Sequence, residues 1–99
     1  MTPASVPVLG LAEAEERARR FAADHVFGLG AVDRAHAELW AAAARYTAVG
    51  AVPVYEVEVE GVLKRGCLGG RAYLGRCLVQ VHGDDGRPLG HRMLRRGSR

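Results

Sequence analysis

The side chains best suited to chemistry in this sequence are one histidine, His91, and two tyrosines, Tyr55 and Tyr73. An imidazole titrates near neutral pH and can act as a general acid or base, and a positioned phenol can donate a hydrogen bond to a developing oxyanion. Together they would suit a small isomerase, cyclase or hydrolase with a pocket between a sheet and its helices. The alternative is a core histidine bonded to a backbone carbonyl and two tyrosines that only pack. Because no carboxylate of evident purpose accompanies them, we favour the second alternative and a protein that is not an enzyme.

The other nucleophiles and metal-binding residues have no recognised arrangement. The two serines, Ser5 and Ser98, lie near the ends of the chain, which argues against a serine nucleophile. No metal-ligand spacing relates the cysteines and histidines, and no glycine-rich phosphate-binding motif follows a strand pattern. We expect Cys67 and Cys77 to be free thiols, because a turn near Gly69 would leave them at different distances along neighbouring strands. The sequence therefore predicts neither a metal site nor a cofactor.

A hairpin around Asp84-Asp85-Gly86 decides where His91 points. Two alternating runs flank this turn sequence, which is typical of a β-hairpin. With a three-residue loop and Gly86 in the left-handed conformation, Gly83 pairs with Arg87 and the apolar residues of both strands share one face. A two-residue turn would instead bury Arg92 among valines. The preferred register places Cys77, Val79, Val81, Leu89, His91 and Met93 on one face and Arg76, Gln80, His82 and Arg92 on the other. It predicts that His91 faces the core and His82 faces solvent.

The first half of the chain predicts a flexible arm and two helices. Residues 1–10 contain two prolines and no hydrophobic period. From Leu11 to about His25 the apolar residues follow helical spacing, and glutamates precede arginines by four residues on the other face. A second helix is expected from Arg34 to about Thr47, with Asp33 as its N-cap and an alanine run in its middle.

The second half predicts an antiparallel sheet. Residues 53–61 alternate between apolar residues and glutamates, as in a strand with one exposed face, and residues 62–65 could extend it. A glycine-rich turn over 66–70 and the hairpin complete the sheet. We therefore predict an α+β fold in which two N-terminal helices pack on a three- to four-stranded antiparallel meander, cystatin-like in arrangement. One domain over residues 11–96 is expected, and residues 97–99 form the end of a basic tail.

The composition is that of an ordinary globular protein, and the arginines near the C-terminus are candidates for binding a partner. With 99 residues, 48% hydrophobic and 25% charged, the chain has enough apolar content to fold as one domain. Of its 14 basic residues only Lys64 is a lysine, an arginine bias that we attribute to a GC-rich bacterial genome. The candidate binding residues are Trp40, Cys77, Arg92, Arg95 and Arg96. The arginines could contact an acidic partner or pair with Glu56, Glu58 and Glu60, whereas nucleic acid is disfavoured because no aromatic platform or recognition helix accompanies them.

The N-terminal residues have neither the charged segment nor the continuous apolar segment of a secretory signal, and no run approaches the length of a membrane span. We expect a cytoplasmic protein without a membrane span.

The C-terminal half resembles the O-type gas vesicle accessory proteins of actinobacteria. Those proteins have an N-terminal helix, a strand rich in valine and glutamate, a strand that ends in an acidic-acidic-glycine turn, and an arginine-rich closing strand. The matching segments here are Val57-Glu-Val-Glu60, Val79-Gln-Val-His-Gly-Asp-Asp-Gly86 and Arg92-Met-Leu-Arg-Arg-Gly-Ser-Arg99. The predicted second helix with Trp40 and the glycine-rich turn depart from that pattern. Similar hairpins occur in cystatin-like and peptidase-propeptide-like domains, and the resemblance implies such a fold.

The expected function is that of a small non-catalytic binding or assembly module, of the gas vesicle accessory type. We expect a homodimer formed through an exposed sheet edge or helix face, with a protein partner or a small apolar ligand.

Overall fold

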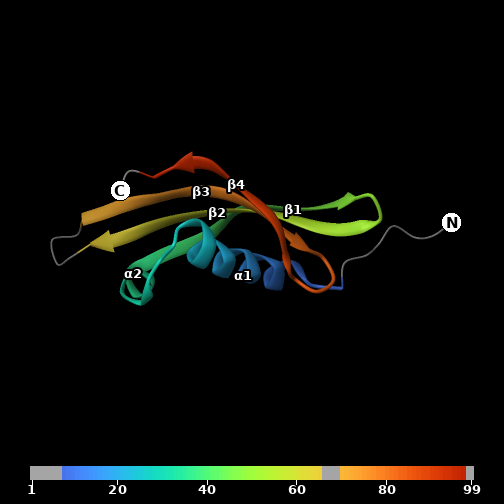
Figure 1. Ribbon diagram of the computed structural model, residues 1–99, viewed down its shortest axis with the longest axis horizontal. Helices are drawn as coiled ribbons and strands as arrows, with labels where there is room; N and C mark the ends of the chain where they lie inside the picture. The colour runs from blue at the N-terminus through green and yellow to red at the C-terminus, as the bar shows by residue number, and fades with distance from the viewer. Residues whose placement is uncertain (1–7, 66–69, 98–99) are drawn as a thin grey trace.

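The computed structural model describes residues 8–65 and 70–97, and shows an α+β fold (Figure 1). An N-terminal helix α1 continues into a π-helical turn η1, and a short helix α2 leads into four strands. Their bounds are α1 Leu11–Phe21, η1 Ala22–Val26, α2 Ala31–His36, β1 Ala37–Val49, β2 Val52–Arg65, β3 Gly70–His82 and β4 Pro88–Arg96.

The four strands form one antiparallel meander in the order β1-β2-β3-β4, so β1 and β4 are the edges. Three of the strands have 13 or 14 residues, which makes the molecule long and narrow, 60 × 21 × 18 Å. The helices lie along one face of the sheet, which we call the inner face, and the opposite face is called the outer face (Figure 1).

The core lies between α1 and the inner face of β2 and β3. Ala14, Ala18 and Ala22 are fully buried, and their small side chains let the helix approach the sheet closely. The sheet contributes Tyr55, Val57, Val59, Cys77, Val79 and Val81, all at most 6% exposed. The alternation predicted for residues 53–61 is therefore confirmed, since the glutamates between these residues lie on the outer face.

The prediction of a second helix from Arg34 to about Thr47 is wrong. Only Ala31–His36 is helical, and β1 follows at once, paired with β2 from Ala37↔Leu63 to Val49↔Val52. Asp33 is not the N-cap either, because Gly30 occupies that position. The alanine run favours a helix by intrinsic propensity, but a propensity of a few tenths of a kcal/mol per residue is outweighed by pairing along a whole strand.

Because β1 takes the place of the predicted second helix, fewer side chains of the sheet are buried than expected. One helix, about 10 Å across, covers the inner face of a sheet whose outermost strands are about 14 Å apart. It covers β2 and β3 most fully, whereas the inner side chains of β1 are only partly buried or exposed and those of β4 are exposed. Leu89 and Met93 of β4, which we predicted to face the core, are 43% and 38% exposed.

The register predicted for the β3–β4 hairpin is confirmed along its middle, where Cys77↔Met93, Val79↔His91 and Gln80↔Gly90 are paired. The turn is different. The backbone N–H of His82 donates to the carbonyl of Arg87 at 2.9 Å, so the loop has four residues, 83–86, instead of three. The unpaired Leu89 then forms a bulge that restores the predicted register. Gly86 has φ +78°, the left-handed conformation expected of it.

Replacing Ala18 with leucine should test the close packing of α1 on the sheet. Because Ala18 is fully buried, the larger side chain must push the helix away, and we expect a loss of about 1–3 kcal/mol of unfolding free energy in urea denaturation. Ala12→Leu on the exposed side of the same helix is the matched control and should be nearly neutral. Equal losses from the two variants would contradict this packing.

Candidate functional site

The three residues considered for catalysis do not come together. Tyr55 is buried on the inner face, and its hydroxyl donates to the carbonyl of Leu9 at 2.8 Å. Tyr73 lies on the outer face and donates to Glu60 Oε2 at 2.5 Å. This bond, together with burial, raises the pKa of Tyr73. His91 lies on the edge strand β4, on the same face as Tyr55 but two strands away from it, and Tyr73 lies on the opposite face.

The two hairpin histidines lie on the predicted faces, His91 inner and His82 outer, but the burial predicted for each is wrong. His91 lies on the inner side, where its ring centroid is 5.2 Å from that of Phe21 at the end of α1, but it is exposed because the helix meets β4 only at its margin. The side chain of His82 is only 13% exposed. Its Nδ1 accepts a hydrogen bond from the backbone N–H of Asp84 at 3.1 Å, since the four-residue loop folds back against the ring.

The best-formed polar site is instead on the outer face, where a row of glutamates on β2 lies between arginines of the neighbouring strands. Glu56 Oε1 accepts a hydrogen bond from Arg45 Nε of β1 at 2.7 Å, and Glu56 Oε2 accepts one from Gln80 Nε2 of β3 at 3.1 Å. These bonds, that of Gln80 first, lower the pKa of Glu56. The Glu56 side chain is 12% exposed, so this carboxylate ties together three strands in a largely dehydrated position.

The row continues along β2. Arg76 of β3 makes an ion pair with Glu58 at 3.0 Å, and Tyr73 bonds Glu60 as described. Arg95 of β4 lies over the ring of Tyr73 at 5.7 Å from its centroid. These partners of the three glutamates therefore lie on β1 and β3, and the arginines of β4 are left to interact with a partner molecule.

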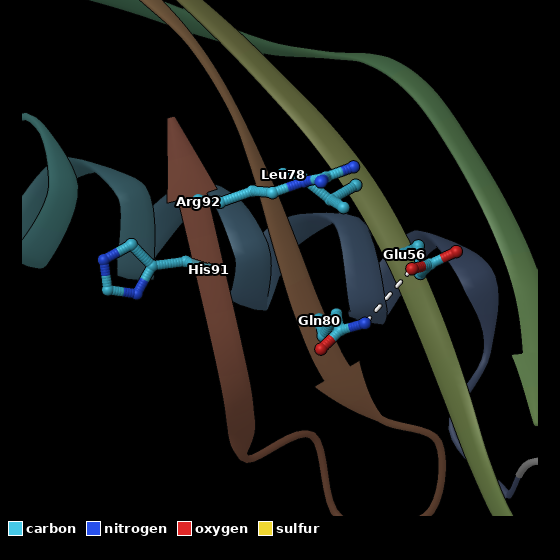
Figure 2. Close-up of a pocket in the computed structure, with 5 residues that line it drawn as sticks. All are labelled: Glu56, Leu78, Gln80, His91 and Arg92. Carbon is cyan, nitrogen blue, oxygen red and sulfur yellow. Dashed lines mark hydrogen bonds between the residues drawn. The ribbon is translucent and has the colours of Figure 1, made fainter. Parts of the chain in front are cut away.

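A hollow of about 340 Å³ opens on the outer face beside this row. It is lined by Glu56, Leu78, Gln80, His91 and Arg92. Figure 2 shows Arg92 extending over Leu78 toward β2, whereas the imidazole of His91 points away from the other four side chains. His91 therefore contributes no imidazole to this hollow.

The predicted binding residues divide between three locations. Trp40, Arg92 and Arg95 occupy outer-face positions and are exposed. Cys77 is fully buried in the core and cannot line a surface, in agreement with its predicted place on the apolar face of the hairpin. Arg96 lines a separate hollow with Val26 and Phe27 on the inner side.

Two residues of the outer face, Arg45 and Leu78, were not predicted to lie there. Arg45 was assigned to a helix, and so its position opposite Glu56 could not be foreseen. A signal was present: a mostly apolar segment, residues 46–54, surrounds Gly50, which has φ +64° in a tight turn between β1 and β2.

Among the described residues, no three potential metal ligands lie close enough to hold an ion. In the same part of the chain, no helix combines the length and apolar character needed to cross a bilayer. Cys77 is a free thiol as predicted, and Cys67 lies outside the described residues. No protein-family model, curated protein or solved structure matches the chain.

Glu56→Gln should reduce stability in a pH-dependent way. The lowered pKa means that the ionised carboxylate stabilises the fold above the unfolded pKa of about 4.3, and that this contribution is lost as the pH falls through the folded value. We expect a loss of about 1–2 kcal/mol near neutral pH that shrinks below about pH 4, measured by urea unfolding across pH.

Glu13→Gln is the control for this prediction, because Glu13 also pairs with an arginine but is half exposed on α1. Its effect should be much smaller. A loss for Glu56→Gln that stayed the same from acid to neutral pH would exclude the electrostatic explanation.

Cys77 should be chemically inert in the folded protein. Burial raises the pKa of its thiol to about 11, and the sulfur has no access to solvent. In a Cys67→Ser chain, we expect no labelling by iodoacetamide under native conditions and one label per chain in denaturant, read by mass spectrometry. Rapid native labelling would show that the core opens at β3.

Proposed function

We propose that this protein is a non-catalytic binding or assembly module that holds a protein partner on the outer face of its sheet. The single observation that supports this most is the outer face itself. No described helix covers it, yet it carries a bonded row of charged side chains beside exposed Trp40 and Leu94, 39% and 42% exposed.

The composition of this face favours a protein as the occupant. Arginine and aromatic residues around a partly apolar centre are typical of protein interfaces, and Trp40, Arg92 and Leu78 provide that combination. Three glutamates on the same face would repel nucleic acid phosphates. The mixed charge instead suits a segment that presents an apolar side chain to the hollow beside Leu78, an acidic group to Arg92 and a basic group to the glutamate row.

The proposal also covers the fold family, the oligomeric state and the cellular location of the protein. A helix followed by an antiparallel meander and an arginine-rich closing strand supports a cystatin-like arrangement and the role of a gas vesicle accessory protein. We further propose a homodimer that works in the cytoplasm. The rival enzyme has no comparable support, because Tyr55, Tyr73 and His91 are dispersed over both faces and one edge.

A photo-crosslinking amino acid at position 78 tests the docking face. In the organism that encodes the chain, we expect a discrete crosslinked protein from position 78 and none from position 12, which is exposed on α1. Arg92→Glu should weaken that crosslink at least severalfold, because it removes a cation at the rim of the hollow. Equal crosslinking from both positions, or none from position 78, would overturn the proposal.

The gas vesicle role has a separate test. Purified chain mixed with intact gas vesicles should float with them on centrifugation, and the Arg92→Glu variant should remain largely in the liquid below. If the unmodified chain does not float with the vesicles, the role as a shell-binding accessory protein is excluded while the docking face remains open to another partner.

A further inference from the structure

The two edges of the sheet differ in how well they are protected against pairing with another strand. An edge strand presents unpaired backbone N–H and C=O groups, and proteins protect such edges with prolines, bulges, charges and short strands. β4 has all of these features: it has nine residues, begins at Pro88, contains bulges at Leu89 and Leu94, and carries three arginines.

β1 has few of these features. It runs for 13 residues without a proline and contains one bulge, at Ala42. Its only charged residues are Glu38 and Arg45, which have opposite signs and both lie on the outer face, opposite Val62 and Glu56 of β2. Their side chains are 56% and 75% exposed. The open edge of the sheet is therefore that of β1.

We infer that β1 pairs antiparallel with β1 of a second copy of this chain, in the register that sets Glu38 opposite Arg45 of the other copy. Two-fold symmetry makes this contact twice. This inference specifies the interface of the homodimer in the proposed function and rests on it, but it does not depend on the identity of any other partner.

The register agrees with the faces of the strand. It sets Trp40 opposite Ala43 of the other copy on the outer face, and Leu39 opposite Ala44 on the inner face. The bulges of both copies meet at the two-fold axis, so neither interrupts the pairing elsewhere. Shifting the register by one residue would oppose inner and outer side chains, which a sheet does not tolerate when its faces differ.

The charges at this interface would form an alternating network. Within one chain Glu38 pairs with Lys64 at 2.5 Å and Arg45 with Glu56 at 2.7 Å. Bringing Glu38 of one copy beside Arg45 of the other links these pairs into a row of four charges of alternating sign. The outer faces of the two copies would also join into one eight-stranded surface with two docking sites.

Two charge-reversal variants test this register. Alone, Glu38→Arg and Arg45→Glu each place like charges opposite each other twice in a homodimer, and we expect the dissociation constant to rise roughly tenfold. Mixed in equal amounts, the two variants restore both opposite-charge contacts in a heterodimer. Since mixing leaves the contacts within each chain unchanged, restoration reports only on the interface.

The measurement is solution mass by light scattering and sedimentation over a range of concentrations, with circular dichroism to verify folding. We expect the unmodified chain at twice its 10.6 kDa mass, each variant shifted toward monomer, and the mixture returned to dimer. Glu13→Arg mixed with Arg17→Glu, an exposed pair on α1, is the control and should leave the dimer unchanged throughout.

The outcomes separate this inference from the proposed function. A dimer that neither variant weakens would overturn pairing through β1 but leave the homodimer standing. Weakening by both variants without restoration on mixing would overturn the register. A monomeric unmodified chain at all concentrations would overturn the homodimer together with its interface, while the docking face would still be judged by crosslinking from position 78.

Discussion

The structure depends on one constraint, that α1 is too narrow to cover the whole inner face of a four-stranded sheet. Van der Waals contact between the alanines of α1 and the valines of β2 and β3 forms the core, and this contact reaches only about two strands' width. The outer face and both edges must therefore remain stable in water without a covering layer. The bonded glutamate row on β2 meets this requirement, because it fixes neighbouring strands to one another through polar side chains that tolerate solvent.

Elements whose structure is determined by nearby residues could be predicted from the sequence, whereas elements determined by distant pairing could not. The alternation in residues 53–61, the periodicity of α1 and the Asp84-Asp85-Gly86 turn are local signals, and each led to the correct element. The segment around Ala41–Ala44 is ambiguous by itself, since alanine favours a helix and its strand conformation comes from pairing with β2. This misassignment also made the exposure of His91 unpredictable, because that exposure depends on how many helices cover the sheet.

The candidate site could be predicted only in part, because some of its features depend on local sequence and others on which strands are neighbours. The outward direction of Glu56, Glu58 and Glu60 follows from their spacing alone, and this much was correct. Their partners depend on which strands lie on either side, and Arg45 became a partner only when its segment proved to be a strand. The hairpin register illustrates a third case, in which the central pairs were correct although the loop differs, because the bulge at Leu89 compensates for the additional loop residue.

The meander order also constrains how the chain assembles. Every strand pairs with its neighbour in sequence, so each hairpin needs only local segments to close, an arrangement associated with rapid folding. The core is different, because α1 is made first yet packs against β2 and β3, which follow more than thirty residues later. During synthesis the apolar side of α1 must therefore wait for these strands, while the glutamate–arginine pairs on its other side already lie within one helix and need no strand to form.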